Sequence, residues 1–300
     1  MKGVFFVLVL LGACARDIPV EDLYDGPGFT DSDSMFVVVT WNIQQFPKAG
    51  TQTINYVADI IHDLQIDVIG LQEIMDASSF DMLVNKLNEM DESNEWGGYR
   101  ANSAYGNYDL AYIYKINESN HYDIFEISGD SYTRNPLVLT IFQEESSIII
   151  INNHFKCCGD GYLDIENSSD EETRRYMESN SLKDYIDINF PSDNVVVIGD
   201  LNDILNDPDT VNVFLNFIED EEHYKFIDME IAHGNSSDWS YPTWPSHIDH
   251  ILITNELFEE HDGVESEVMT VKIDNYISGG WTEFAQNISD HRPVAWKFKL

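Results

Sequence analysis

Residues 194–203 read NVVVIGDLND, in which an apolar, β-branched run gives way at once to a glycine and a group of carboxylate and amide side chains. The run predicts a buried strand. Asp200 and Asn202 follow at the end of that strand, where a rigid sheet can hold them in place for chemistry. The structural alternative is an Asx turn, in which both side chains only hydrogen-bond the nearby backbone.

The same pattern, an apolar run bordered by polar side chains, occurs five more times. The border residues are Asn42, Gln72-Glu73, Asn152-Asn153-His154, His247-Ile248-Asp249-His250 and Ser289-Asp290-His291. Taken singly, each has a structural explanation, such as a turn cap, a charge at a helix N-terminus or a hydrogen-bonded core histidine. Asp249 is the hardest to explain in this way, because an unpaired buried carboxylate is costly. Six such borders indicate one shared site.

Hydrophobic spacing predicts three helices and eight strands. The helices are expected at residues 51–64, 80–90 and 171–190, and the strands at 35–41, 67–71, 109–114, 137–142, 147–152, 194–198, 248–253 and 293–298. The later strands follow one another without strict strand–helix alternation, which favours an α+β layered fold. No second linker interrupts residues 35–300, so we expect them to form one domain.

The charge balance limits the substrates that the protein can attract. Among 300 residues, 54 are acidic and 16 are basic, which gives a formal net charge of −38. A surface that coats polyanions over a wide area is therefore excluded. An anionic substrate must be captured locally, with the help of a bound cation, because the overall field repels it.

The first residues read MKGVFFVLVLLGAC and contain an apolar run after a single lysine. This run is too short to span a bilayer of about 30 Å and is typical of a secretory signal. Small residues lead directly to Cys14, so the segment resembles a bacterial lipobox, which implies removal of residues 1–13 and lipidation of Cys14. An ordinary signal peptide is the alternative. The acidic residues 14–34 are then a tether, and the protein is expected outside the cytoplasm, anchored to a bacterial membrane or secreted.

Six segments, in this order and spacing, resemble the endonuclease/exonuclease/phosphatase superfamily. They are TWN (40–42), LQE (71–73), NNHFK (152–156), GDLND (199–203), IDHILI (248–253) and SDHRPV (289–294). The combination is far more specific than any one of its short motifs. The resemblance implies a four-layer α/β/β/α sandwich of two mainly antiparallel sheets flanked by helices. It also implies metal-dependent hydrolysis of a phosphoester.

The resemblance implies a metal site built from Glu73 as principal ligand, with Asn42 and Asp290 beside it. Carboxylate and amide oxygens suit a hard cation, Mg²⁺ or Mn²⁺. Asn42 would also contact the substrate. A further Ca²⁺ ion is also possible, but the sequence does not locate its site because the chain has many acidic loops.

The catalytic roles implied by the resemblance fall on five side chains. Asp200 would orient or deprotonate the attacking water, and Asn202 would hold the phosphate and that water. His291, tuned by Asp249, would act on the scissile phosphate as a base or as an electrostatic stabiliser. His154 would bind a non-bridging oxygen or assist the leaving group. The sequence leaves the choice of base between Asp200 and His291 open.

Two positions depart from the family pattern. Deoxyribonuclease-like members have a glutamate just before the strand at 109–114 as a partner for the histidine at position 154. Here that glutamate is missing, and Asp109 is the nearest substitute. The family's usual tyrosine after Asp249 is His250, which we expect to be structural.

Three functions compete. The first is an extracytoplasmic nuclease acting on DNA or RNA, because HFK and the glycine-containing loop after it resemble secreted bacterial nucleases; Lys156, Arg174 and Arg175 would bind its substrate. The second is a sphingomyelinase-like phospholipid phosphodiesterase, or a phosphatase, with residues 239–245 (WSYPTWP) as a lipid-facing loop. The third is a non-catalytic binding module. The full set of catalytic-type residues argues against the binding module, and the resemblance of the loop favours the nuclease, with nucleic acid as substrate and the membrane reached through Cys14. Cys157 and Cys158 form a vicinal disulfide, bond between molecules, or stay reduced.

Overall fold

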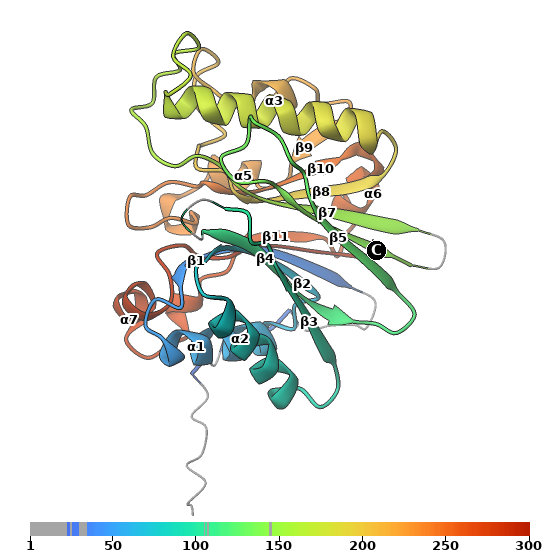
Figure 1. Ribbon diagram of the computed structural model, residues 1–300, viewed down its shortest axis with the longest axis vertical. Coiled ribbons are helices and arrows are strands. Elements are labelled where there is room, and N and C mark those ends of the chain that lie inside the picture. The colour runs from blue at the N-terminus through green and yellow to red at the C-terminus, as the bar shows by residue number, and fades with distance from the viewer. Residues whose placement is uncertain (1–22, 25, 30–34, 105, 107, 144–145) are drawn as a thin grey trace, which may run out of the picture.

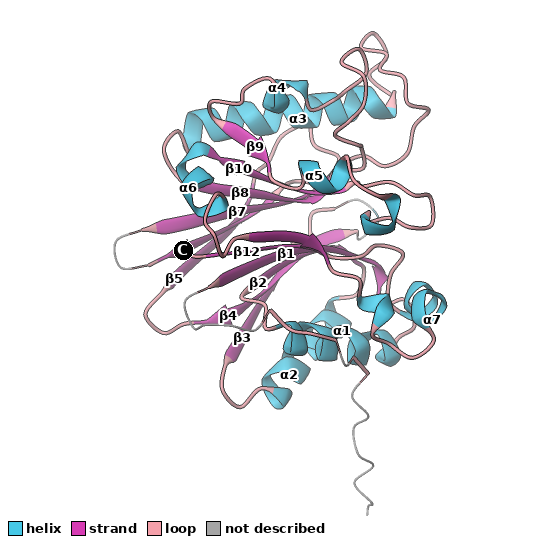
Figure 2. Cartoon of the chain, turned by 180° about the vertical axis from the view of Figure 1, so that it is seen from behind, coloured by secondary structure: helices cyan, strands magenta, loops and turns pink. Residues whose placement is uncertain are grey.

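The computed structural model describes residues 23–24, 26–29, 35–104, 106, 108–143 and 146–300. The predicted signal peptide, Cys14 and most of the predicted tether lie outside these residues. The described chain folds into two sheets packed face to face, with a layer of helices on each outer face (Figures 1 and 2).

The first sheet has the strand order β11-β12-β1-β2-β4-β3. Its strands are β1 (Phe36–Phe46), β2 (Val68–Ile74), β3 (Glu95–Arg100), β4 (Asp109–Ile116), β11 (Glu267–Thr270) and β12 (Val294–Phe298). Strands β1 and β2 run parallel, and the other paired neighbours described run antiparallel.

The second sheet has the order β5-β6-β7-β8-β10-β9. Its strands are β5 (His121–Glu126), β6 (Leu137–Phe142), β7 (Ser147–His154), β8 (Asn194–Asp200), β9 (Tyr224–Phe226) and β10 (Asp249–Thr254). Here β7 and β8 form the parallel pair, and the remaining described pairs are antiparallel.

The helices divide between the two outer faces, as Figure 1 shows. On the side of the first sheet lie α1 (Thr51–Leu64), α2 (Ala77–Met90) and α7 (Gly280–Asn287); on the side of the second lie α3 (Glu171–Asn189), α4 (Leu215–Ile218), α5 (Met229–Ala232) and α6 (Phe258–His261). Short 3-10 turns occur at Ser236–Asp238, Asn255–Leu257 and Ile273–Asn275. In the described chain, we find no helix with the length and apolar character needed to cross a membrane.

The predicted fold class is confirmed, and each predicted strand and helix has a counterpart. The strands β3, β5, β9 and β11 were not predicted from the sequence, nor were the helices shorter than nine residues. All four missed strands lie at a sheet edge. The segment β3 reads EWGGYR and is largely exposed, so it carries neither a continuous apolar run nor a regular alternation.

The core has three apolar layers because side chains alternate along each strand. In β7, Ile148 and Ile150 face the other sheet, while Ile149 and Ile151 face the helix layer around α3. The helices α1 and α2 bury their apolar faces against the opposite side of the first sheet. Each central strand is therefore buried on both faces, which explains its nearly continuous apolar sequence.

Asn152 replaces the isoleucines of β7 at the next position that faces the other sheet. Its Nδ2 donates to the carbonyl oxygens of Leu71 (3.0 Å) and Ala111 (3.1 Å), and its Oδ1 accepts from Gln72 Nε2 at 2.7 Å. Two strands of the first sheet are thus held by one side chain of the second. The sheets also approach closely here: a Cβ on Gly70 would lie 2.5 Å from Ile198 Cδ1 and 3.1 Å from the Asn152 amide.

We predict that Asn152→Ala lowers the free energy of unfolding by about 3 kcal/mol, because it removes three buried hydrogen bonds and leaves their partners unsatisfied. Urea unfolding followed by circular dichroism measures this loss. The matched control is Asn189→Ala on the exposed face of α3, which should change stability by less than about 0.5 kcal/mol. Equal stability of the two variants would contradict the bridging role.

Candidate active site

The strand alternation that builds the core also places the candidate site. The stripe of each central strand that faces the other sheet is apolar in the middle and polar at one end of the sandwich. It ends in Asn42 on β1, His154 on β7 and Asp200 on β8, and it begins with Asp249 on β10. These four side chains are 0–3% exposed. Polar side chains from both sheets therefore point into the same space.

This space is a cavity of about 350 Å³. Its lining includes seven of the residues predicted from sequence: Asn42, Glu73, His154, Asp200, Asn202, Asp290 and His291. The remaining lining residues are Gln44, Gln45, Cys157, Cys158, Tyr241, Ser246 and Ile248. Asp249 is fully buried behind His291. Side chains that are up to 249 residues apart in the sequence thus meet in one pocket.

Two irregularities in the first sheet turn side chains into the pocket. The register of β1 and β2 shifts between Asn42 and Phe46, and that of β2 and β4 shifts between Leu71 and Ile74. Glu73 lies in the second shift with a φ of +66°, and Gln45 lies in the first with a φ of +52°. The Gln45 amide donates to Glu73 Oε2 at 2.9 Å. Such bulges re-aim side chains, and strained residues of this kind concentrate at functional sites.

His291 and Asp249 form a buried ion pair. His291 Nδ1 lies 2.8 Å from Asp249 Oδ2, and its backbone carbonyl accepts a hydrogen bond from Trp41 Nε1 at 2.9 Å. The ring also lies against Tyr241, with 4.7 Å between centroids. Burial lowers the pKa of His291, but the nearby carboxylates of Asp249 and Asp200 outweigh burial and raise it to about 10. His291 is therefore an imidazolium that points Nε2 into the cavity.

Asp200 lies between two imidazoles. Its Oδ2 is 3.6 Å from His154 Nε2 and 3.9 Å from His291 Nε2, and it accepts from Asn42 Nδ2 at 2.9 Å. Burial is the main cause that raises the pKa of Asp200, to about 7; His291 opposes the shift. A carboxylate with its pKa raised in this way can take up a proton near neutral pH.

His154 has the opposite character to His291. Burial lowers its pKa well below the usual value, and Arg134 and His291 add to that effect. It is therefore neutral. Its Nδ1 is buried without a hydrogen-bond partner among the residues that the structure describes. Asp109, the nearest substitute for the family's glutamate, is instead paired with Arg100 and accepts from the Ala104 amide at 3.1 Å.

Asn202 is held by the turn that follows β8. Its backbone has a φ of +55°, its amide donates to Asp200 Oδ1 at 3.1 Å, and its Nδ2 donates to the Phe155 carbonyl at 3.1 Å. The Asx turn considered for GDLND is therefore present. Asp200 and Asn202 form this turn and also line the pocket. The structural and the functional interpretations of the two residues therefore do not exclude each other.

The three basic side chains that were predicted to bind substrate, Lys156, Arg174 and Arg175, do not line the cavity. Arg175 is 3% exposed, with Nε 2.8 Å from Asp203 Oδ2 and Nη1 donating to the carbonyls of Lys156 and Cys158. Lys156 Nζ donates to the Cys157 carbonyl at 3.0 Å, and Arg174 donates to Thr133 Oγ1 at 3.0 Å. Arg175 thus organises the loop after β7 from inside the protein.

Two lining residues, Gln44 and Gln45, were not predicted, nor were Lys48 and Arg134, which bond to residues of the lining. Gln44 donates through Nε2 to Asp290 Oδ2 at 2.8 Å, and Lys48 Nζ bonds the Gln44 side chain. Arg134 Nη1 donates to the His154 carbonyl at 3.1 Å and its guanidinium lies over the Tyr108 ring. Gln44 and Gln45 lie just beyond Asn42, so extending the predicted first strand by four residues would have included them. Arg134 lies in a loop with no sequence signal.

Residues 39–291 match the sequence model of the Endonuclease/Exonuclease/phosphatase family. The chain belongs to this family. The match runs from the first strand of the sandwich to His291 and includes all seven predicted residues that line the cavity. The chain is therefore assigned to the family's hydrolases of phosphoester bonds. A search of curated proteins gives no match.

Solved structures share the fold at low sequence identity. TDP2 from D. rerio, complexed with a single-strand DNA product, is 12% identical with a TM-score of 0.62, covering 89% of this chain and 100% of that chain. The human Nocturnin catalytic domain with bound sulfate is 15% identical with a TM-score of 0.61, covering 90% and 96%. An endonuclease/exonuclease/phosphatase from Bacteroides vulgatus is 15% identical with a TM-score of 0.58, covering 89% and 99%.

The donor set of the pocket fits the divalent cation typical of this family. Glu73, Asp200 and Asp290 line the cavity, and Asn42 donates to both Glu73 Oε1 (3.3 Å) and Asp200 Oδ2 (2.9 Å). Glu73 and the neighbouring carboxylate Asp249 both raise the pKa of Asp200, beyond the larger effect of burial. An excess of carboxylates in a confined, oxygen-rich space suits a hard cation.

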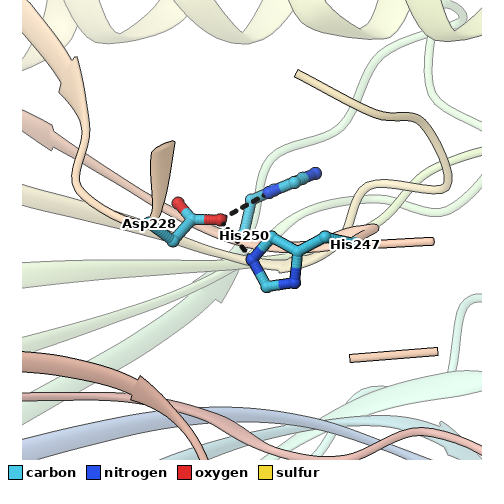
Figure 3. Close-up of side chains that lie close together, drawn as sticks. All are labelled: Asp228, His247 and His250. Atoms are coloured by element: carbon cyan, nitrogen blue, oxygen red, sulfur yellow. Dashed lines mark hydrogen bonds and ion pairs between the residues drawn. The ribbon is translucent and has the colours of Figure 1, made fainter. Parts of the chain in front are cut away.

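A second buried cluster, drawn in Figure 3, consists of Asp228, His247 and His250. His250 Nδ1 lies 2.6 Å from Asp228 Oδ2, and His250 Nε2 lies 2.9 Å from the Asp203 carbonyl. Both partners can only accept, so His250 carries both protons and is cationic. Burial lowers the pKa of His250, but Asp228 outweighs it and raises that pKa.

The polar atoms of the other two residues in this cluster, His247 and Asp228, also form hydrogen bonds. His247 Nε2 lies 2.9 Å from Asp228 Oδ2, and its Nδ1 accepts from the Ser240 amide at 3.3 Å, which makes His247 neutral. Asp228 Oδ1 accepts from the Ile251 amide at 3.1 Å. The cluster is thus neutral overall and saturated by hydrogen bonds. It holds the Asp203 end of the GDLND turn against β10, in agreement with the structural role expected for His250.

A larger cavity, of about 1060 Å³, lies between the edge strands β9 and β11. Its lining mixes apolar side chains, such as Phe217, Met229 and Phe258, with polar ones from the strands and loops. None of the predicted site residues lines it. The chemistry of the lining, and not the volume, therefore locates the candidate active site.

We predict that His250→Asn lowers the free energy of unfolding by about 3 kcal/mol near pH 6, because it breaks a buried ion pair. The folded-state pKa of His250 is raised above 6.5, so its contribution is complete below pH 6.5 and is lost as pH rises through the folded-state pKa. The stability difference between wild type and variant should therefore shrink at alkaline pH. Urea unfolding from pH 5.5 to 9.5 measures it.

The control is His233→Asn, at an exposed histidine, which should leave stability nearly unchanged across the series. A difference for His250→Asn that is constant over the whole pH range would contradict the assignment of a buried imidazolium.

Proposed function

We propose that the protein is an extracytoplasmic, metal-dependent nuclease that hydrolyses phosphodiester bonds of DNA or RNA. The observation that carries this proposal is the position of Asp200 between the neutral His154 and the cationic His291, within a pocket rich in carboxylates. In-line attack of water on phosphorus needs a proton acceptor, neutralisation of charge and accurate positioning.

The pKa directions divide the roles. His291 is kept protonated by Asp249, so it stabilises the charge that develops on the phosphoryl oxygens. Asp200 has a raised pKa and accepts the proton of the attacking water. Asn202, fixed by the turn after β8, orients that water. His154 donates a hydrogen bond through Nε2 to a phosphoryl or leaving-group oxygen. Bound by Glu73, Asn42 and Asp290, Mg²⁺ or Mn²⁺ would neutralise phosphoryl charge.

Two observations support a nucleic acid substrate. The D. rerio TDP2 structure of the same fold holds a single-strand DNA product. Lys48 bonds the pocket residue Gln44, and Arg134 bonds the His154 carbonyl, so local positive charge borders the pocket despite the net charge of −38. Because the overall field opposes polyanions, we expect weak, salt-sensitive binding with catalysis governed by the pocket.

A phospholipid headgroup is the second candidate, and Trp244 is the observation in its favour. Tyr241 and Ser246 line the pocket and exchange backbone hydrogen bonds of 3.0 and 3.2 Å. Trp244 lies between them in sequence and is 75% exposed. An exposed aromatic side chain in a segment whose ends line the pocket can enter a lipid interface or stack on a base.

A substrate panel with Mg²⁺ separates these candidates: plasmid DNA, RNA, sphingomyelin vesicles and an inositol phosphate. We expect cleavage of nucleic acid without lipid hydrolysis, and complete loss of cleavage in EDTA. Lipid hydrolysis without nucleic acid cleavage would select the second candidate. Activity that survives EDTA would contradict the metal assignment.

Single substitutions test the assigned roles. We predict that His291→Ala, Asp200→Asn and Glu73→Gln each lower turnover by at least about 100-fold, since each removes a proton-transfer or charge-stabilising group. Glu89→Gln, on the exposed face of α2, is the matched control and should keep wild-type turnover. Circular dichroism verifies folding, and near-wild-type rates for a folded variant would remove that residue from the mechanism.

We also propose that Cys14 is lipidated after removal of residues 1–13, which would anchor the enzyme outside the cytoplasm. In a bacterial host fed with labelled palmitate, the wild-type chain should incorporate label and fractionate with membranes. Cys14→Ser should lose both properties, while Cys158→Ser should keep them. Equal labelling of wild type and Cys14→Ser would contradict this proposal.

A further inference from the structure

We propose that the loop leading into α3 contains a Ca²⁺ site, separate from the catalytic pocket, formed by Asp160, Asp170 and Glu172. One oxygen from each of these carboxylates lies within 4.8 Å of the others. Two oxygens bound to the same Ca²⁺ ion can be at most about 5 Å apart. The loop connects β7 to α3 and extends beyond the end of the sheets (Figure 1).

Glu172 provides the observation that points to a ligand. The residue is only 3% exposed, and its Oε2 is buried without a hydrogen-bond partner in the described chain. Its Oε1 accepts from the Gly161 amide at 2.6 Å. A buried carboxylate oxygen without a donor is costly unless a charge or a hydrogen bond compensates it. A cation bound between the three carboxylates would provide that compensation.

The loop backbone is shaped around this carboxylate. Gly159 has a φ of +120°, and a Cβ at that position would lie 2.2 Å from Glu172 Oε1. Asp170 caps α3 through Oδ2, which accepts from the Thr173 amide at 2.8 Å. Asp160 is held by the Tyr162 amide, 3.1 Å from its Oδ1. The three carboxylates therefore have fixed places in the loop.

The charge of this region is not balanced by the protein. Arg175 Nη2 is 3.4 Å from Glu172 Oε1, and the same guanidinium binds Asp203 through Nε at 2.8 Å. One positive charge thus serves two carboxylates, and Asp160 and Asp170 add two more. The four carboxylates and one guanidinium leave three negative charges, which favours a divalent cation.

The chemistry favours Ca²⁺ over Mg²⁺. Ca²⁺ accepts six to eight oxygen ligands at 2.3–2.6 Å in flexible geometry, whereas Mg²⁺ requires a near-ideal octahedron and keeps several waters. Three carboxylates from an irregular loop match the first ion. Backbone carbonyls of the loop and water would complete its shell.

The site would act on the wall of the catalytic pocket. Cys157 and Cys158 line that pocket, and Arg175, which contacts Glu172, donates to the carbonyls of Lys156 and Cys158. Bound Ca²⁺ would therefore fix this wall from behind. The site itself does not depend on the proposed nuclease activity, so we test it by binding.

The experiment is calorimetric titration of the full chain, stripped with EGTA, with Ca²⁺ in the presence and absence of excess Mg²⁺. Glu73→Gln is present in every sample to disable the catalytic metal site. We expect one Ca²⁺ per chain, binding at least 10-fold tighter than Mg²⁺, and a Ca²⁺-dependent rise in Tm. Glu172→Gln should lose both effects. Glu171→Gln removes a neighbouring carboxylate that does not belong to the proposed site. This variant should keep both the Ca²⁺ binding and the Ca²⁺-dependent rise in Tm.

Asp160→Asn is the second test variant. Asp160 is exposed, so its substitution should leave the fold intact while weakening Ca²⁺ binding at least 10-fold. The proposal is overturned if Asp160→Asn binds Ca²⁺ like the parent, if the parent shows no Ca²⁺ binding, or if Mg²⁺ binds as tightly as Ca²⁺.

Discussion

The structure depends on how two sheets are held together at the end where their shared core stops being apolar. Asn152 crosses from the second sheet and bonds the Leu71 and Ala111 carbonyls of the first. Because Asn42 and Glu73 come from one sheet and Asp200 and His154 from the other, this contact also sets the distance between the two halves of the pocket. The geometry of the candidate active site is therefore a consequence of sheet packing.

Strand periodicity explains why much of the fold and of the pocket can be predicted from sequence. A buried strand can be identified in the sequence by its apolar run. The polar residue at its end, such as Asp200 or Asp249, occupies the next position that faces the other sheet in the same alternation. The central strands and the long helices follow from this rule. The edge strands do not, because a half-exposed segment such as β3 lacks both a run and an alternation.

The sequence is less informative wherever the backbone leaves the regular pattern. The register shifts that aim Glu73 and Gln45 inward depend on pairing with neighbouring strands, which no local motif records. The position of the Arg175 side chain is another feature that the local sequence does not predict. A basic pair at the start of a helix suggests a substrate contact, but the acidic loop and Asp203 bind its guanidinium inside the protein. Such partners are distant in sequence.

The two ends of the sandwich differ in character. The pocket lies where β1, β2, β7 and β8 end, whereas the turn at residues 117–120, which joins β4 to β5, lies at the other end of these sheets. That turn contributes nothing to the pocket lining. A fluorophore or a surface linkage placed there would therefore leave the reactive end facing outward, and the molecule could be immobilised in a defined orientation.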